Sequence, residues 1–138
     1  MKSLSPCCLG PLSLSLSVLR RSGADERRRA LLALDARVAT ASSSASIEGL
    51  VVEYGDVLNF LRSLQAFYAQ QESLAALRVA LPHFDILCTG DRSLTVEVRL
   101  SPDFREEWHV YRFSPTRADI RAFINTLEVS LVSVPLPT

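Results

Sequence analysis

Three short stretches in the second half of the chain have the pattern of β-strands. Residues 84–89 are apolar and rich in strand-forming types, residues 94–100 alternate between apolar and polar without a break, and residues 108–113 are largely aromatic or β-branched. Turn-forming residues separate them, at Gly90-Asp91 and at Pro102-Asp103. Since strands joined by short connections usually pair, the pattern predicts a three-stranded antiparallel meander.

A helix is predicted over residues 116–133, directly after the third strand. Thr116 and Asp119 have the spacing of a capping box, in which each side chain satisfies a free backbone amide at the helix start. Apolar residues then recur at helical intervals and form one stripe: Ile120, Phe123, Ile124, Leu127 and Leu131.

A longer helix is predicted over residues 56–80, with Asp56 as its N-cap and Pro82 beyond its end. In the stretch from Ile47 to Val79, six apolar residues are spaced alternately by four and three positions, as at the a and d positions of a heptad: Leu50, Tyr54, Val57, Leu61, Leu64 and Tyr68. Two interpretations remain open. The stripe forms a short dimerising coiled coil, or it is the core face of a helix packed on the sheet of its own domain.

Together these elements predict an α+β fold in which two helices cover the three-stranded meander, with the domain spanning residues 47–138. Residues 1–46 are predicted to be a partly disordered leader, with a short helix over residues 24–40 and a serine-rich linker at residues 42–46. Residues 1–22 hold three basic residues and no acidic residue, a composition that also fits a mitochondrial presequence.

Charge and hydropathy narrow the range of partners. Residues 1–46 carry seven basic and three acidic residues, and residues 47–138 carry eight basic and twelve acidic residues. An acidic folded part argues against direct nucleic-acid binding, which needs a clustered basic patch. No apolar run approaches the roughly 20 residues that span a bilayer, so no membrane contact is expected.

The chemistry-bearing residues are few. The chain has three cysteines, too few and too unevenly spaced for a disulfide framework or a zinc site, and no phosphate-binding glycine loop. Asp85 and Cys88 lie three residues apart on one predicted strand and therefore point to opposite faces. His83 is expected in a solvated loop and His109 on a half-buried strand face. We expect no catalytic, cofactor-binding or metal-binding residues, and an enzyme that uses Cys88 is the alternative.

A family resemblance enters through the strand region. The stretches Phe84–Gly90, Leu94–Leu100 and Trp108–Pro115 carry an aromatic residue with Cys-Thr-Gly beginning four residues later, then an alternating strand, then a strand with a tyrosine followed by a proline. This order resembles the globular domain of the coiled-coil subunit of monopolin, in the wider RWD-like group found at the ends of kinetochore coiled coils. The resemblance covers residues 56–134. It implies a homodimer joined through a coiled coil, with an apolar patch that grips kinetochore or cohesion proteins.

The sequence therefore predicts a non-enzymatic protein-interaction domain, acting as a dimerising adaptor in chromosome segregation and located in the nucleus. Its partners would be proteins, in a homodimer or a hetero-oligomer formed through the six-residue stripe. One alternative is a small mitochondrial subunit or assembly factor with a cleaved presequence. The other is the small enzyme that uses Cys88.

Overall fold

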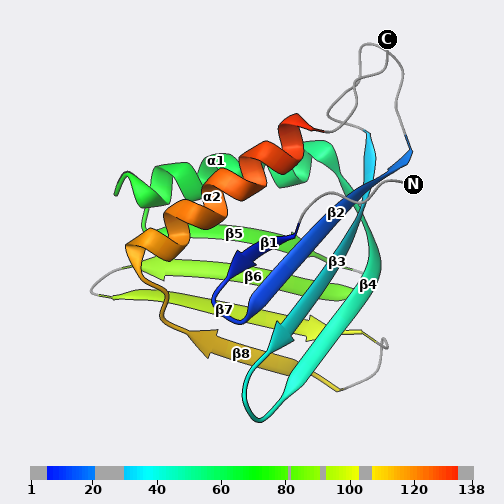
Figure 1. The fold of residues 1–138 in the computed structure, drawn as a ribbon, viewed down its shortest axis with the longest axis horizontal. Coiled ribbons are helices and arrows are strands. Elements are labelled where there is room, and N and C mark those ends of the chain that lie inside the picture. Colours follow the sequence, from blue (N-terminus) through cyan, green and yellow to red (C-terminus); the bar gives the residue numbers. More distant parts are fainter. Residues whose placement is uncertain (1–5, 21–29, 81, 91–92, 103–106, 134–138) are drawn as a thin grey trace.

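The chain folds as two successive units, each with four strands followed by one helix (Figure 1). The computed structural model describes residues 6–20, 30–80, 82–90, 93–102 and 107–133. The elements follow in the order β1 (Cys7–Leu9), β2 (Leu12–Arg20), β3 (Leu31–Ala39), β4 (Ser44–Glu53), α1 (Tyr54–Tyr68), β5 (Leu74–Val79), β6 (His83–Gly90), β7 (Leu94–Ser101), β8 (His109–Phe113) and α2 (Arg117–Val132). Strands β1 to β4 form one antiparallel sheet, here called sheet A, and β5 to β8 form a second, sheet B; in both, the strands lie in chain order.

Sheet A arises from period-two patterning in the first third of the chain. In β2 the leucines of Leu12–Ser17 are buried and the serines between them lie on the outer face. In β3 the same alternation buries Leu32, Leu34, Ala36 and Val38. The two strands pair antiparallel along most of their length. Each strand thus presents one apolar face to the core and one small or polar face to solvent.

Helix α1 begins directly after β4 and ends much earlier than its apolar pattern suggests. Beyond Tyr68 the backbone of Gln70 turns left-handed, with φ 62°. The N–H of Gln71 donates to the carbonyl of Ala66 at 2.9 Å, and the N–H of Gln70 donates to that of Phe67 at 3.0 Å. This pair of bonds is a Schellman motif, which closes a helix by satisfying its last carbonyls. The chain is therefore free to start β5 at Leu74.

Sheet B and α2 contain the elements that the sequence predicted best. The predicted strands correspond to β6, β7 and β8, and the last helix is α2. Its capping box is confirmed: the Thr116 hydroxyl accepts from the Asp119 N–H at 3.1 Å, and the Asp119 carboxylate accepts from the Thr116 N–H at 2.9 Å. Strand β5 adds to β6 on the side away from β7, which makes sheet B four-stranded.

The two sheets and the two helices enclose a single apolar core. Figure 1 shows the strands of sheet A running across those of sheet B, with α1 and α2 side by side along one margin. Each helix packs on the first strand of the other unit: α1 lies on β5, and α2 lies on β1. The helices also meet each other, with the rings of Phe60 and Phe123 edge to face and their centroids 6.5 Å apart.

The predicted fold, a three-stranded meander covered by two helices, is wrong, because the structure has two sheets of four strands. The leader predicted for residues 1–46 contributes strands β1, β2 and β3, and the helix predicted over 24–40 is a strand from Leu31 onward; residues 24–29 lie outside the described ranges. The predicted linker at 42–46 forms the turn into β4 and its first residues. The helix predicted over 56–80 covers Tyr54–Tyr68 only, because β5 follows.

Candidate functional site: the outer face of sheet B

The six residues predicted as a dimer interface lie almost wholly inside the protein. Leu50 is a buried residue of strand β4, ahead of the helix. Tyr54, Val57, Leu61 and Leu64 are buried on the inner face of α1, and only Tyr68 is partly exposed. The Tyr68 ring is covered on one side by the guanidinium of Arg117, 4.4 Å from the ring centre. In this chain the stripe therefore packs against its own sheets and α2, as in the core-helix interpretation.

The residues considered for nucleophilic chemistry are only partly brought together. Cys88 is fully buried in the core, and burial raises the pKa of its thiol to about 12. Asp85 faces the other side of sheet B, where its Oδ2 lies 2.6 Å from His83 Nε2. His109 lies half-buried on the inner side of β8. Cys88 is thus held as a neutral thiol, on the face of the sheet away from the His83–Asp85 pair.

Thiol labelling of the native protein should therefore separate the three cysteines by burial. Cys8 is exposed, whereas Cys7 and Cys88 are buried. We expect Ellman's reagent to modify Cys8 rapidly at neutral pH and to reach the other two only after unfolding in denaturant. A Cys8→Ser variant is the control and should show no fast phase. Rapid modification of Cys88 in the folded Cys8→Ser protein would contradict the burial described above.

A serine also lies near the His83–Asp85 pair, but its hydroxyl is engaged elsewhere. Ser101 is the cross-strand neighbour of His83, so the pleat places both residues on the outer face of sheet B. The Ser101 hydroxyl donates to the carbonyl of Glu107 at 3.1 Å, and the residue is buried. A nucleophile needs its hydroxyl proton directed at a base. This hydrogen bond therefore joins the end of β7 to Glu107 rather than forming part of a Ser–His–Asp site.

The outer face of sheet B carries the largest exposed aromatic side chain of the described residues. Along β8 and the residue before it the side chains alternate: Tyr111 and Phe113 pack toward the core, whereas Trp108, Val110 and Arg112 point outward. Trp108 and Val110 are each 49% exposed. We call the outward side of β8 and its neighbours on β6 and β7 the β8 surface, made of His83, Asp85, Glu97, Arg99, Trp108, Val110 and Arg112.

Three charged residues on β7 and β8, Glu97, Arg99 and Arg112, form a ladder of hydrogen bonds beside Trp108 and Val110. The Nε of Arg99 donates to one Glu97 oxygen at 2.6 Å, and the Nε of Arg112 donates to the other at 2.5 Å. The hydrogen bond from Arg112 lowers the pKa of Glu97; burial opposes this shift and the interactions with Arg99 reinforce it. Glu97 therefore stays ionised at neutral pH and anchors Arg112, whose side chain is 70% exposed.

His83 and Asp85 support the tryptophan. The imidazole of His83 meets the Trp108 ring edge to face, with centroids 4.5 Å apart. Asp85 Oδ2 is bound to His83, while its Oδ1 is buried and has no hydrogen-bond partner among the described residues. Asp85 also lies between Arg78 and Arg99 in the cross-strand register. The contact with His83 restricts the Trp108 ring without covering it.

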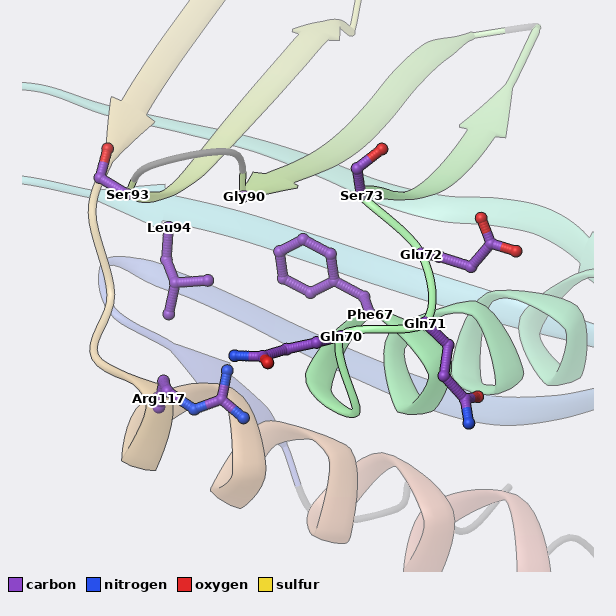
Figure 2. A pocket seen from close by; sticks show the side chains of 9 residues that line it. All are labelled: Phe67, Gln70, Gln71, Glu72, Ser73, Gly90, Ser93, Leu94 and Arg117. Carbon is purple, nitrogen blue, oxygen red and sulfur yellow. The ribbon is translucent and has the colours of Figure 1, made fainter.

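A wide hollow lies elsewhere, at the end of α1 (Figure 2). It is an open depression of about 730 Å³ with Phe67 at its base, and its rim carries exposed polar side chains such as Gln70 and Glu72. At its margin, the guanidinium of Arg117 is already engaged in a hydrogen bond, which it donates to the Tyr68 carbonyl at 2.7 Å. Gly90 closes the base, since a Cβ there would lie 2.9 Å from the Phe67 ring. The described residues that line the depression bring no convergent set of charged groups together, so we regard the β8 surface as the stronger candidate.

The sequence did not reveal the β8 surface as a site. His83 was expected in a solvated loop, yet it is the first residue of β6 and is bound to Asp85. The alternation of residues 108–113 does place Trp108, Val110 and Arg112 on one face, but it does not say which face is buried. Within the described ranges, histidines, cysteines and carboxylates nowhere form a group of three or more that could hold a metal ion. Neither described helix is long and apolar enough to cross a bilayer.

Comparison with known proteins adds no relative: no protein-family model matches the chain, and no curated protein matches it significantly.

Proposed function

We propose that this chain is a non-enzymatic protein-interaction domain and that its partner docks on the β8 surface. One observation carries the proposal: the edge strand β8 and the residue before it present two half-exposed apolar side chains, Val110 and Trp108, beside backbone groups that no further strand of the described chain covers. Open strand edges are sites where proteins add another chain. Tryptophan is enriched among the residues that dominate binding energy at interfaces.

The surroundings of Trp108 support a docking role. Its ring is held by His83 on one side, so little side-chain freedom remains to be lost on binding. The ladder of Glu97, Arg99 and Arg112 beside it supplies a polar rim. An apolar centre with a charged rim is the usual composition of a protein–protein interface.

The non-enzymatic part of the proposal is supported by the state of the candidate nucleophiles. The Cys88 thiol is buried and its pKa is raised, so it is not available as a thiolate. The Ser101 hydroxyl is directed at a backbone carbonyl rather than at His83. Neither residue meets the geometric requirement for an activated nucleophile.

A substitution at Val110 tests the docking surface. The tagged chain is used to capture protein from a lysate, the captured protein is purified, and its affinity is measured by titration calorimetry. We expect Val110→Asp to weaken binding by at least about tenfold, because a charge replaces apolar area at the interface centre. Leu74→Asp is the matched control: Leu74 is 47% exposed on β5, at the opposite edge of sheet B.

The comparison of the two variants decides the outcome. Both must first show the circular dichroism spectrum of the intact chain. The proposal requires that the same purified protein bind the wild type and Leu74→Asp equally and bind Val110→Asp weakly. Equal binding by both variants, or a wild type that neither captures a protein above an untagged control nor associates with itself, overturns it.

Within this proposal the partner belongs to chromosome segregation and the compartment is the nucleus. Both statements rest on the resemblance of residues 84–115 to the monopolin domain. A C-terminal fluorescent fusion tests them, because nuclear foci support them and a mitochondrial network contradicts them. Loss of a presequence at residues 1–22 would remove β1 and β2, whose leucines are buried in the core. This burial argues against the cleavage of a presequence at these residues.

A further inference from the structure

We infer that the occupant of the β8 surface is a second copy of this chain. The two protomers would pair β8 with β8 in antiparallel orientation, about a twofold axis at Val110, so that two four-stranded sheets become one continuous sheet. This inference rests on the proposed function and names its partner. It also moves the expected dimer contact from the buried stripe of α1 to the edge of sheet B.

The four sheet edges of the described structure differ in how they are covered. At the β1 edge, α2 packs alongside, with Ser130 Oγ 3.4 Å from Cys7 Sγ. Strand β4 is interrupted by a bulge where Gly49, at φ +69°, donates its N–H to Asp35 at 2.7 Å. Strand β5 lies against α1. Bulges and covering helices are the usual means of blocking edge pairing.

Strand β8 has neither a bulge nor a helix packed along it among the described residues. Figure 1 shows it at the outer margin of sheet B, where it pairs with β7 alone, and the turn between β3 and β4 reaches past it in this view. It contains no proline and no bulge against β7. Its backbone is therefore the one that can accept a further strand with a regular ladder.

The side chains of β8 are complementary to their own copy. When Val110 lies opposite the partner's Val110, antiparallel order places Trp108 opposite the partner's Arg112, and it does so twice by symmetry. A guanidinium over an indole ring is the most favourable common cation–π pair. An axis at Tyr111 would instead place Arg112 opposite Val110 and Trp108, one residue ahead of β8, opposite the partner's Ser114, which makes Val110 the better centre.

The structure already positions both members of this pair. Glu97 binds the Nε of Arg112 and leaves its remaining N–H groups and its faces exposed. The contact with His83 holds the Trp108 ring. Little conformational freedom is left to lose when the two side chains meet across the axis.

The β3–β4 turn enlarges the contact on the inner side of the sheet. The Ser43 hydroxyl lies 2.8 Å from the Tyr111 hydroxyl, so the turn lies against β8 one residue from the proposed axis. The turns of the two copies would therefore lie near each other. A single short strand pair is still at the small end of specific interfaces, so we expect a concentration-dependent dimer rather than a permanent one.

Disulfide trapping of the full chain tests the register. In a Cys8→Ser background, which removes the exposed native thiol, we expect Val110→Cys to cross-link to its own copy under mild oxidation. Residues that face each other across an antiparallel pair have Cα atoms roughly 4.5–5.5 Å apart, within disulfide range. Arg112→Cys, opposite Trp108 in the proposed register, and Leu74→Cys, at the other edge, should each cross-link at least about tenfold more slowly.

Sedimentation velocity measures the association itself, from about 10 µM to about 1 mM, where weak interfaces are populated. We expect the wild type and Leu74→Asp to shift toward a dimer over this range and Val110→Asp to stay monomeric, since two carboxylates would face each other. A wild type that stays monomeric, a dimer unaffected by Val110→Asp, or equal cross-linking at residues 74 and 110 overturns the inference. If a different protein binds in a Val110-dependent way while the chain stays monomeric, the proposed function stands and this inference fails.

Discussion

Replacing Leu61 and Leu64 of α1 by aspartate is expected to unfold the protein rather than to separate a dimer. Leu61 is 4% exposed and Leu64 is fully buried between the sheets and the helices. Each substitution places a carboxylate in an apolar site without a partner, at a cost of several kcal/mol. Since a domain of this size is stable by about 5–15 kcal/mol, the pair of changes exceeds or consumes that margin.

The measurement is far-ultraviolet circular dichroism with thermal unfolding of the full chain. Arg62→Asp is the control on the same helix turn, because Arg62 is exposed. It should keep the native spectrum and a cooperative transition, whereas Leu61→Asp with Leu64→Asp should lose both. A double variant that remains folded but changes its oligomeric state would show that α1 forms the interface after all.

Residues 47–138 are expected not to fold by themselves, although the sequence suggested that they form the domain. Their isolation removes β1, β2, β3 and the start of β4, Ser44–Ser46, and the rest of β4 then has no strand to pair with. The buried residues of β2 and β3 belong to the same apolar cluster as those of sheet B and α2, so their loss exposes a large apolar area. We expect a disordered or aggregating fragment.

An amide proton–nitrogen correlation spectrum of the fragment decides this prediction against the intact chain. The intact chain should give dispersed signals and a cooperative denaturant transition. The fragment should give collapsed signals and a gradual, non-cooperative response. Dispersed signals from residues 47–138 alone would mean that sheet A is dispensable, contrary to the single core described here.

The elements of the second half were predictable because their signals agree with one another. In β7 the alternation, the flanking turns and the length all point to a strand, and the capping box of Thr116 and Asp119 marks the start of α2. The first half carries conflicting signals. In β3, Leu31, Leu34 and Val38 fit a helical period while Leu32, Leu34 and Ala36 fit a strand, and only pairing with β2 and β4 selects the strand.

Strand β2 was missed for a different reason. Its strict Leu–Ser alternation is a strand pattern, but its simple composition and basic flanks also fit a leader. The early end of α1 had no sequence signal, since the left-handed position that closes it is Gln70 and not the usual glycine. The β8 surface depends on which side of sheet B faces sheet A, and that cannot be read from a single strand.

The placement of each helix on the opposite unit has a consequence for how the protein opens. The helix α2 packs on β1, and α1 packs on β5, so the first and last described elements are in direct contact. If either of these two elements detaches, the buried side chains of the other become exposed to solvent. Local opening from a terminus should therefore cost nearly as much as global unfolding. Amide hydrogens in β1, in the centre of sheet B and in α2 should then exchange with similar protection, as one cooperative unit.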